Sequence, residues 1–101
     1  GAQLDARNVD GKTATNAASA LGHLKVVEVL VKAGAQLEAR DEFGRTALLS
    51  AAQEGEPKVV EALVKAGAQL KACAEQGGTA LLLAAYSGCQ EAVEALVKAG
   101  A

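Results

Sequence analysis

The sequence predicts an all-α fold, a solenoid of three stacked helix-turn-helix units. The first observation is a period of 33 residues, at which glycine recurs without insertion or deletion at Gly1, Gly34, Gly67 and Gly100. The second is composition: half of the residues are hydrophobic, yet the chain has one Phe, one Tyr and no Trp or Met. A core of Ala, Val and Leu suits thin, closely packed helices. Because one helix pair cannot bury its apolar stripe alone, about three units must stack.

We expect a single domain over residues 1–101, with repeats at 1–33, 34–66 and 67–99 and a stub at 100–101. The heptapeptide VKAGAQL occurs at 31–37 and again at 64–70, and VKAGA ends the chain. Each copy has the composition of a helix's last turn, its glycine stop and an apolar lead into the next connection.

The first helix of each unit is clearest in the second repeat. Thr46 is a good N-cap, because its hydroxyl can accept a hydrogen bond from an amide of the first turn. The segment ALLSAAQE, residues 47–54, follows as a short helix of strong formers. Gly55 supplies the positive φ that commonly ends a helix.

A second helix then begins at Pro57, whose fixed φ suits the first helical position. Its apolar residues form one stripe at Val59, Val60, Leu63 and Val64. The connection to the next unit, such as QLEARDEFGRT at 36–46, is polar and contains glycine, so it predicts an extended turn.

Charge and composition exclude several classes of function. The net charge is −2, from ten basic and twelve acidic residues that are interspersed, which argues against a polyanion-binding surface. No apolar run approaches the roughly 20 residues that span a bilayer, and GAQLDARN at the start is not a signal peptide. Two cysteines do not make a disulfide framework. We therefore expect a soluble protein of a reducing compartment, the cytoplasm or nucleus.

The sequence offers no catalytic, cofactor-binding or metal-binding set. His23 is the single histidine, so no Ser/His/Asp or Cys/His system can be proposed. Cys73 and Cys89 flank a helix that would separate them by roughly 12 Å, beyond the ~7 Å that a disulfide allows. Their spacing also fails the zinc patterns, and no phosphate-binding GxxxxGK loop occurs. We expect two free thiols and no enzyme.

Three segments resemble the ankyrin-repeat signature TPLHxAAxxGH: TATNAASALGH at 13–23, TALLSAAQEG at 46–55 and TALLLAAYSG at 79–88. VVEALVKAGA at 59–68 is similar to the family's second helix and Gly-Ala turn. The resemblance covers essentially the whole chain. It implies L-shaped units, each with two antiparallel helices and a projecting hairpin loop.

Departures from the signature lead to two expectations. The usual His is replaced by Asn16, Leu49 and Leu82, so the side-chain-to-backbone bonds attributed to that His should be missing. With Thr15, Asn16 also suggests that the first repeat is partly water-facing.

Two further expectations concern the third repeat. Ala74 stands where the second repeat has Asp41, so the third loop should be looser. The apolar run TALLLAAY and the absence of a polar capping repeat predict an apolar terminal face of a few hundred Å². On this reading the chain is either a fragment of a longer array or a minimal engineered one.

The resemblance also implies where partners would dock, on the hairpin tips and on the concave face made by the first helices. Carried over residue by residue, this surface comprises Val9, Asp10, Lys12, Leu21, Arg40, Glu42, Phe43, Arg45, Gln53, Glu54, Glu75, Gln76, Tyr86 and Ser87.

Both aromatic residues of the chain, Phe43 and Tyr86, fall within that set. Aromatic anchors are favoured at binding surfaces, although each ring could instead cover its own loop or a neighbouring repeat. The charged members have mixed signs, as in Arg40 beside Glu42. They form either a solvated rim or a selector for a partner of alternating charge.

The leading hypothesis is a non-catalytic module that binds another protein or a peptide through the concave face and hairpin tips. The alternative is an engineered or consensus-like structural scaffold without a dedicated partner. A third hypothesis is head-to-tail self-association through the uncapped ends. The sequence indicates neither a nucleic-acid partner nor insertion into a membrane.

Overall fold

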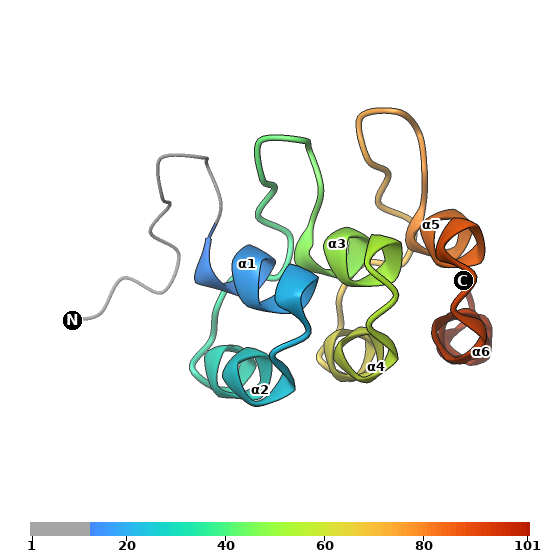
Figure 1. Ribbon diagram of the computed structural model, residues 1–101. Coiled ribbons are helices and arrows are strands. Elements are labelled where there is room, and N and C mark those ends of the chain that lie inside the picture. Colours follow the sequence, from blue (N-terminus) through green and yellow to red (C-terminus); the bar gives the residue numbers. More distant parts are fainter. Residues whose placement is uncertain (1–12) are drawn as a thin grey trace.

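The computed structural model describes residues 13–101, in which six helices form two rows (Figure 1). One row, called the inner helices below, contains the first helix of each repeat: α1 (Ala14–Leu21), α3 (Ala47–Gln53) and α5 (Ala80–Ser87). The other row contains α2 (Leu24–Lys32), α4 (Pro57–Lys65) and α6 (Gln90–Ala99). The loops between successive pairs project away from both rows. The predicted all-α architecture of stacked helix-turn-helix units is therefore confirmed.

The helix ends follow the local signals in the sequence. Thr46 Oγ1 accepts a hydrogen bond from the Leu49 N–H at 3.3 Å, so Thr46 caps α3 as predicted. Thr13 and Thr79 cap α1 and α5 in the same way. Gly55 has a φ of +69°, and α4 begins at Pro57.

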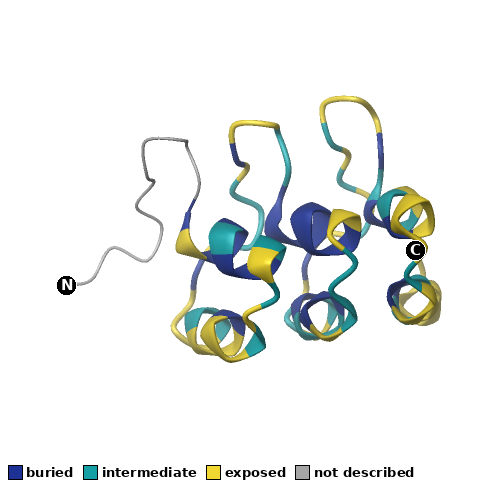
Figure 2. Ribbon diagram, viewed as in Figure 1, coloured by how far each residue is buried: buried dark blue, intermediate teal, exposed yellow. Residues whose placement is uncertain are grey.

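Stacking between repeats produces the core. The main helix–helix contacts lie within a repeat, as for α3 and α4, or between adjacent repeats, as for α1 with α3 and α3 with α5. Because α3 has a neighbour on each side, every residue from 47 to 52 is buried (Figure 2). In the last repeat α5 lacks one neighbour, and Leu82 is 46 % exposed whereas its counterpart Leu49 is 1 % exposed.

The expectation that Thr15 and Asn16 face water is wrong, because both side chains are buried. Asn16 Oδ1 accepts hydrogen bonds from Thr13 N–H at 3.1 Å and from Thr13 Oγ1–H at 2.9 Å. Its Nδ2 donates to the Ala39 carbonyl at 3.2 Å. The expected loss of side-chain-to-backbone bonds is therefore also wrong at Asn16, which completes a capping box and ties α1 to the following loop.

The longest helix that the structure describes, α6, has 10 residues, whereas a helix that spans a bilayer needs about 20.

Candidate functional site

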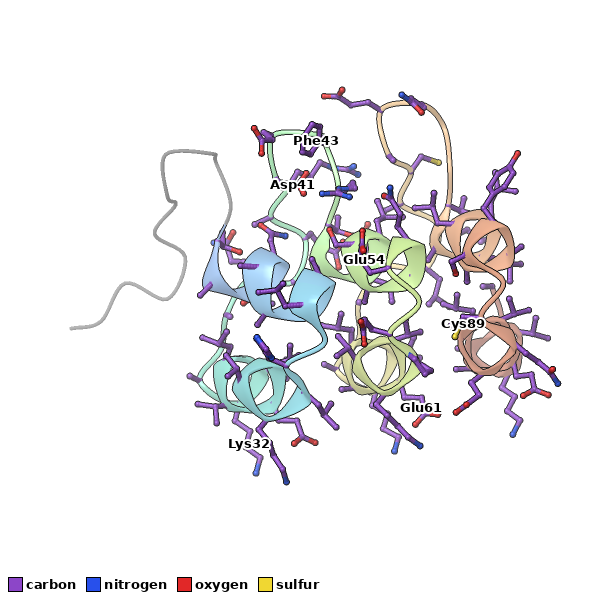
Figure 3. The ribbon with its side chains drawn as sticks, viewed as in Figure 1. Lys32, Asp41, Phe43, Glu54, Glu61 and Cys89 are labelled. Carbon is purple, nitrogen blue, oxygen red and sulfur yellow. The ribbon has the colours of Figure 1, made fainter. Side chains whose placement is uncertain are left out.

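The second hairpin loop, residues 38–46, is built around the carboxylate of Asp41. Asp41 Oδ1 accepts the backbone N–H groups of Phe43 and Arg45, each at 2.9 Å. Asp41 Oδ2 accepts from Arg45 Nε at 3.1 Å and forms an ion pair with Arg45 Nη2 at 3.0 Å. Only 1 % of the Asp41 side chain is exposed. The carboxylate therefore fixes the turn that carries Phe43 (Figure 3).

These contacts set the pKa of Asp41. Burial by itself raises the pKa of the carboxyl, but the hydrogen bonds from Arg45 and from the Phe43 N–H, together with the Arg45 charge, outweigh burial. The pKa of folded Asp41 is therefore lowered from its ordinary value. A lowered folded-state pKa stabilises the fold above the unfolded-state pKa, and this contribution is lost as pH falls through the folded-state pKa.

Arg45 links this turn to the inner helix row. Its guanidinium lies over the Phe43 ring, with Cζ 5.1 Å from the ring centroid, and Nη1 donates to Gln53 Oε1 at 3.0 Å. A cation–π contact of this kind orients an exposed ring. Phe43 is 56 % exposed at the hairpin tip.

The third hairpin loop, residues 71–79, keeps the same backbone turn without the carboxylate. Ala74 N–H donates to the Gly78 carbonyl at 2.9 Å, as Asp41 N–H donates to the Arg45 carbonyl at 2.9 Å. The third loop also contains an isolated bridge between Cys73 and Thr79. The side-chain bonds to two amides are absent because Ala74 has no acceptor.

The two loops contact each other. Arg40 Nη1 donates to the Cys73 carbonyl at 2.6 Å and also to its own loop at the Gly44 carbonyl. The Glu75 side chain lies against Gly44, where an added Cβ would come within 2.5 Å of Glu75 Cγ. Gly44 has a φ of +73°, so both its backbone conformation and this close approach favour glycine.

A groove of about 610 Å³ lies where these loops meet the inner helices. Phe43, Arg45 and Gln53 contribute from the second repeat. The third repeat contributes Ala74, Glu75, Gln76, Gly78, Leu82, Leu83 and Tyr86. Its lining is mixed: Phe43, Leu82, Leu83 and Tyr86 lie beside Arg45, Gln53, Glu75 and Gln76.

The structure brings together part of the predicted surface. The predicted residues that line the groove are Phe43, Arg45, Gln53, Glu75, Gln76 and Tyr86. The predicted residues outside its lining are Leu21, Arg40, Glu42, Glu54 and Ser87. Val9, Asp10 and Lys12 lie outside the described residues. Tyr86 is 81 % exposed, so its ring does not cover a neighbouring repeat.

Sequence reasoning missed Leu82 and Leu83, which form part of the groove wall. Both lie within the apolar run of the third repeat, which was expected to contribute to an apolar terminal face and not to a groove. The sequence signal that could have identified a groove residue is at Leu83, because the equivalent residue of the second repeat is the polar Ser50.

The remaining reactive side chains do not form a site. Cys73 and Cys89 are free thiols, as predicted. Over residues 13–101, no group of three His, Cys, Asp or Glu side chains could hold a metal ion.

The Asp41 cluster yields a pH-dependent prediction. Asp41→Asn keeps an oxygen for the amides but removes the charge that pairs with Arg45, so we expect a loss of about 1–3 kcal/mol in the free energy of unfolding at neutral pH. This difference from the wild type should shrink as pH falls through the folded-state pKa. Urea unfolding at several pH values measures it, and a difference that stays constant into acid would contradict the assignment.

Ala74→Asp is the converse variant. The N–H groups of Gln76 and Gly78 follow Ala74 at the positions that Phe43 and Arg45 occupy after Asp41. We expect stabilisation of about 0.5–1.5 kcal/mol from the new hydrogen bonds.

Comparison with known families agrees with this architecture. The family model for ankyrin repeats in three copies matches residues 34–101, and the model of the single ankyrin repeat matches residues 10–42. Comparison with curated proteins gives no match. Ankyrin repeats are generally non-catalytic modules of protein–protein interaction. On the strength of the matched residues and the stacked helix pairs, the chain belongs to the ankyrin-repeat family.

Proposed function

We propose that this chain is a non-catalytic module that binds another protein or a peptide through the groove between its hairpin loops and inner helices. The observation that carries the proposal is that Phe43 and Tyr86 line one groove and are both largely exposed. Large aromatic surfaces left in water in an otherwise Ala-, Val- and Leu-rich protein favour burial against a partner.

The contacts that hold the side chains of the second hairpin loop in place also support this proposal. Phe43 is held by Arg45, and Arg45 is held in turn by Asp41 and Gln53. A side chain that is oriented before binding loses less conformational entropy when a partner covers it.

The scaffold alternative, a consensus-like or engineered array without a dedicated partner, shares this fold. It differs in that the aromatic groove would have no specific occupant. We further propose an intracellular, reducing compartment, the cytoplasm or nucleus, which the two free cysteines support.

The proposal predicts the behaviour of the double variant Phe43→Ala/Tyr86→Ala. A protein retained by the wild type in a pull-down should be lost from this variant, because both anchors are removed, while circular dichroism stays unchanged. The control Val26→Ala/Val29→Ala removes exposed apolar side chains from α2 and should retain that protein. A partner that binds all three equally would contradict the proposed site, and no specific partner would favour the scaffold alternative.

A second candidate function, self-association, is favoured by the two ends of the array. Val97 on α6 is exposed, whereas its counterpart Val64 on α4 is half-buried beside α6. At the other end, Val26 is exposed on α2, whereas its counterpart Val59 is fully buried on α4. Both ends thus expose positions that internal junctions cover, so a second copy could stack head-to-tail.

The charges that would meet if a second copy stacked head-to-tail also favour a junction between copies. Glu61 and Glu91 line one groove between α4 and α6. At a junction between two copies, Glu94 of one copy would take the place of Glu61, and Lys25 of the next copy would take the place of Glu91. The junction between copies would therefore place opposite charges where the junction between the second and third repeats has two carboxylates.

Sedimentation velocity tests this second candidate. We expect the wild type to sediment faster as its concentration rises and Val97→Lys to remain monomeric, because a lysine cannot be buried at the junction. Phe43→Ala is the matched control and should behave as the wild type. A wild type that is monomeric at every concentration would rule out this association.

A further inference from the structure

We infer that the segment bound in the groove carries a lysine or arginine beside an apolar side chain. This inference rests on the proposed protein-binding function and specifies the chemistry of the partner. It starts from the charges that line the groove, Arg45 and Glu75.

The positive charge of the groove is already matched within the protein. Arg45 donates to both Asp41 and Gln53, and its side chain is 14 % exposed. Among residues 13–101, by contrast, Glu75 has neither a hydrogen bond nor an ion pair. A partner therefore meets one unmatched charge in the groove, and that charge is negative.

The surroundings of the groove have the same sign. The loop tips and the end of α3 carry two arginines and four carboxylates, a net charge of −2: Arg40, Arg45, Asp41, Glu42, Glu54 and Glu75. Glu42 and Glu54 are exposed and, within the described chain, make neither a hydrogen bond nor an ion pair. Arg40 is engaged with carbonyl oxygens of both hairpin loops. This field attracts a cationic segment and repels an acidic one.

The Glu75 side chain is exposed, and its carboxylate lies beside Gly44 of the second loop. A Cβ added at Gly44 would lie 3.2 Å from Glu75 Cδ and 3.3 Å from Glu75 Oε1. A carboxylate that is exposed and lines the groove can accept charge-assisted hydrogen bonds from a partner.

Apolar surface lines the same groove. Leu82 and Tyr86 are exposed there, and Leu83 is half-buried. The methylene stem of a lysine or arginine can cover such surface while its charged end reaches Glu75. The neighbouring apolar side chain of the partner would then contact Phe43 or Tyr86, and Tyr86 also offers a ring face to a cation.

Selection from a random peptide library, displayed on phage, tests this inference with three forms of the protein. The wild type should enrich peptides that contain lysine or arginine next to an apolar residue. Glu75→Gln keeps the shape of the side chain but removes its charge, so its selected peptides should lose the basic residue. Glu28→Gln, on the exposed surface of α2, is the matched control and should select the same peptides as the wild type.

A synthetic peptide with a sequence enriched by the wild type then measures how much Glu75 contributes to the affinity. Its Kd should rise about 5- to 20-fold with Glu75→Gln, the loss expected for one charge-assisted contact. Binding should also weaken from about 0.1 M to about 1 M NaCl, as the Debye length falls from ~10 Å to ~3 Å. Fluorescence anisotropy measures both effects.

The outcomes separate this inference from the function on which it rests. Enriched peptides that lack basic residues, but lose binding with Phe43→Ala/Tyr86→Ala, would overturn the basic partner and leave the binding module intact. Basic peptides that bind Glu75→Gln as tightly as the wild type would overturn the role of Glu75. If no peptide is enriched, both the inference and a peptide-binding groove are contradicted.

Discussion

Burial of each helix pair against its neighbours is the interaction on which the rest of this structure depends. The helices are only 7 to 10 residues long, and an isolated helix of this length is marginal in water. α3 is buried along most of its length because it is packed between α1 and α5, whereas α5 leaves Leu82 in solvent. Stability in such an array is approximately a sum of repeat and junction terms, so each junction adds its own contribution.

Stacking also determines where a partner can bind. It places successive inner helices and hairpin loops side by side, so the groove takes its walls from two repeats and exists in neither alone. The loop tips do not have to form the helical core, which leaves positions such as Phe43 and Glu75 open to vary. The loops are nevertheless ordered by polar contacts, from Asp41 within one loop and from Arg40 between the two.

Features decided within a few residues could be predicted from the sequence. The threonine caps, the glycine stops and the start of α4 at Pro57 all depend on local backbone chemistry. The burial of Thr15 and Asn16 was predicted wrongly, because it depends on what packs against the first repeat. The bond from Asn16 to Ala39 spans 23 residues and the bond from Arg40 to Cys73 spans 33. Contacts at that range, and hence the groove, follow from stacking geometry that composition and spacing do not contain.

The dependence on stacking is tested most directly by making the same substitution at equivalent positions of two repeats. Leu49 and Leu82 occupy equivalent positions, but Leu49 is buried between repeats and Leu82 has no following repeat against it. In urea unfolding, Leu49→Ala should cost about 2–5 kcal/mol, as for a buried core leucine, and Leu82→Ala about 1 kcal/mol or less because much of the side chain is already in water. Equal losses at the two positions would show that the junctions between repeats do not hold the fold together.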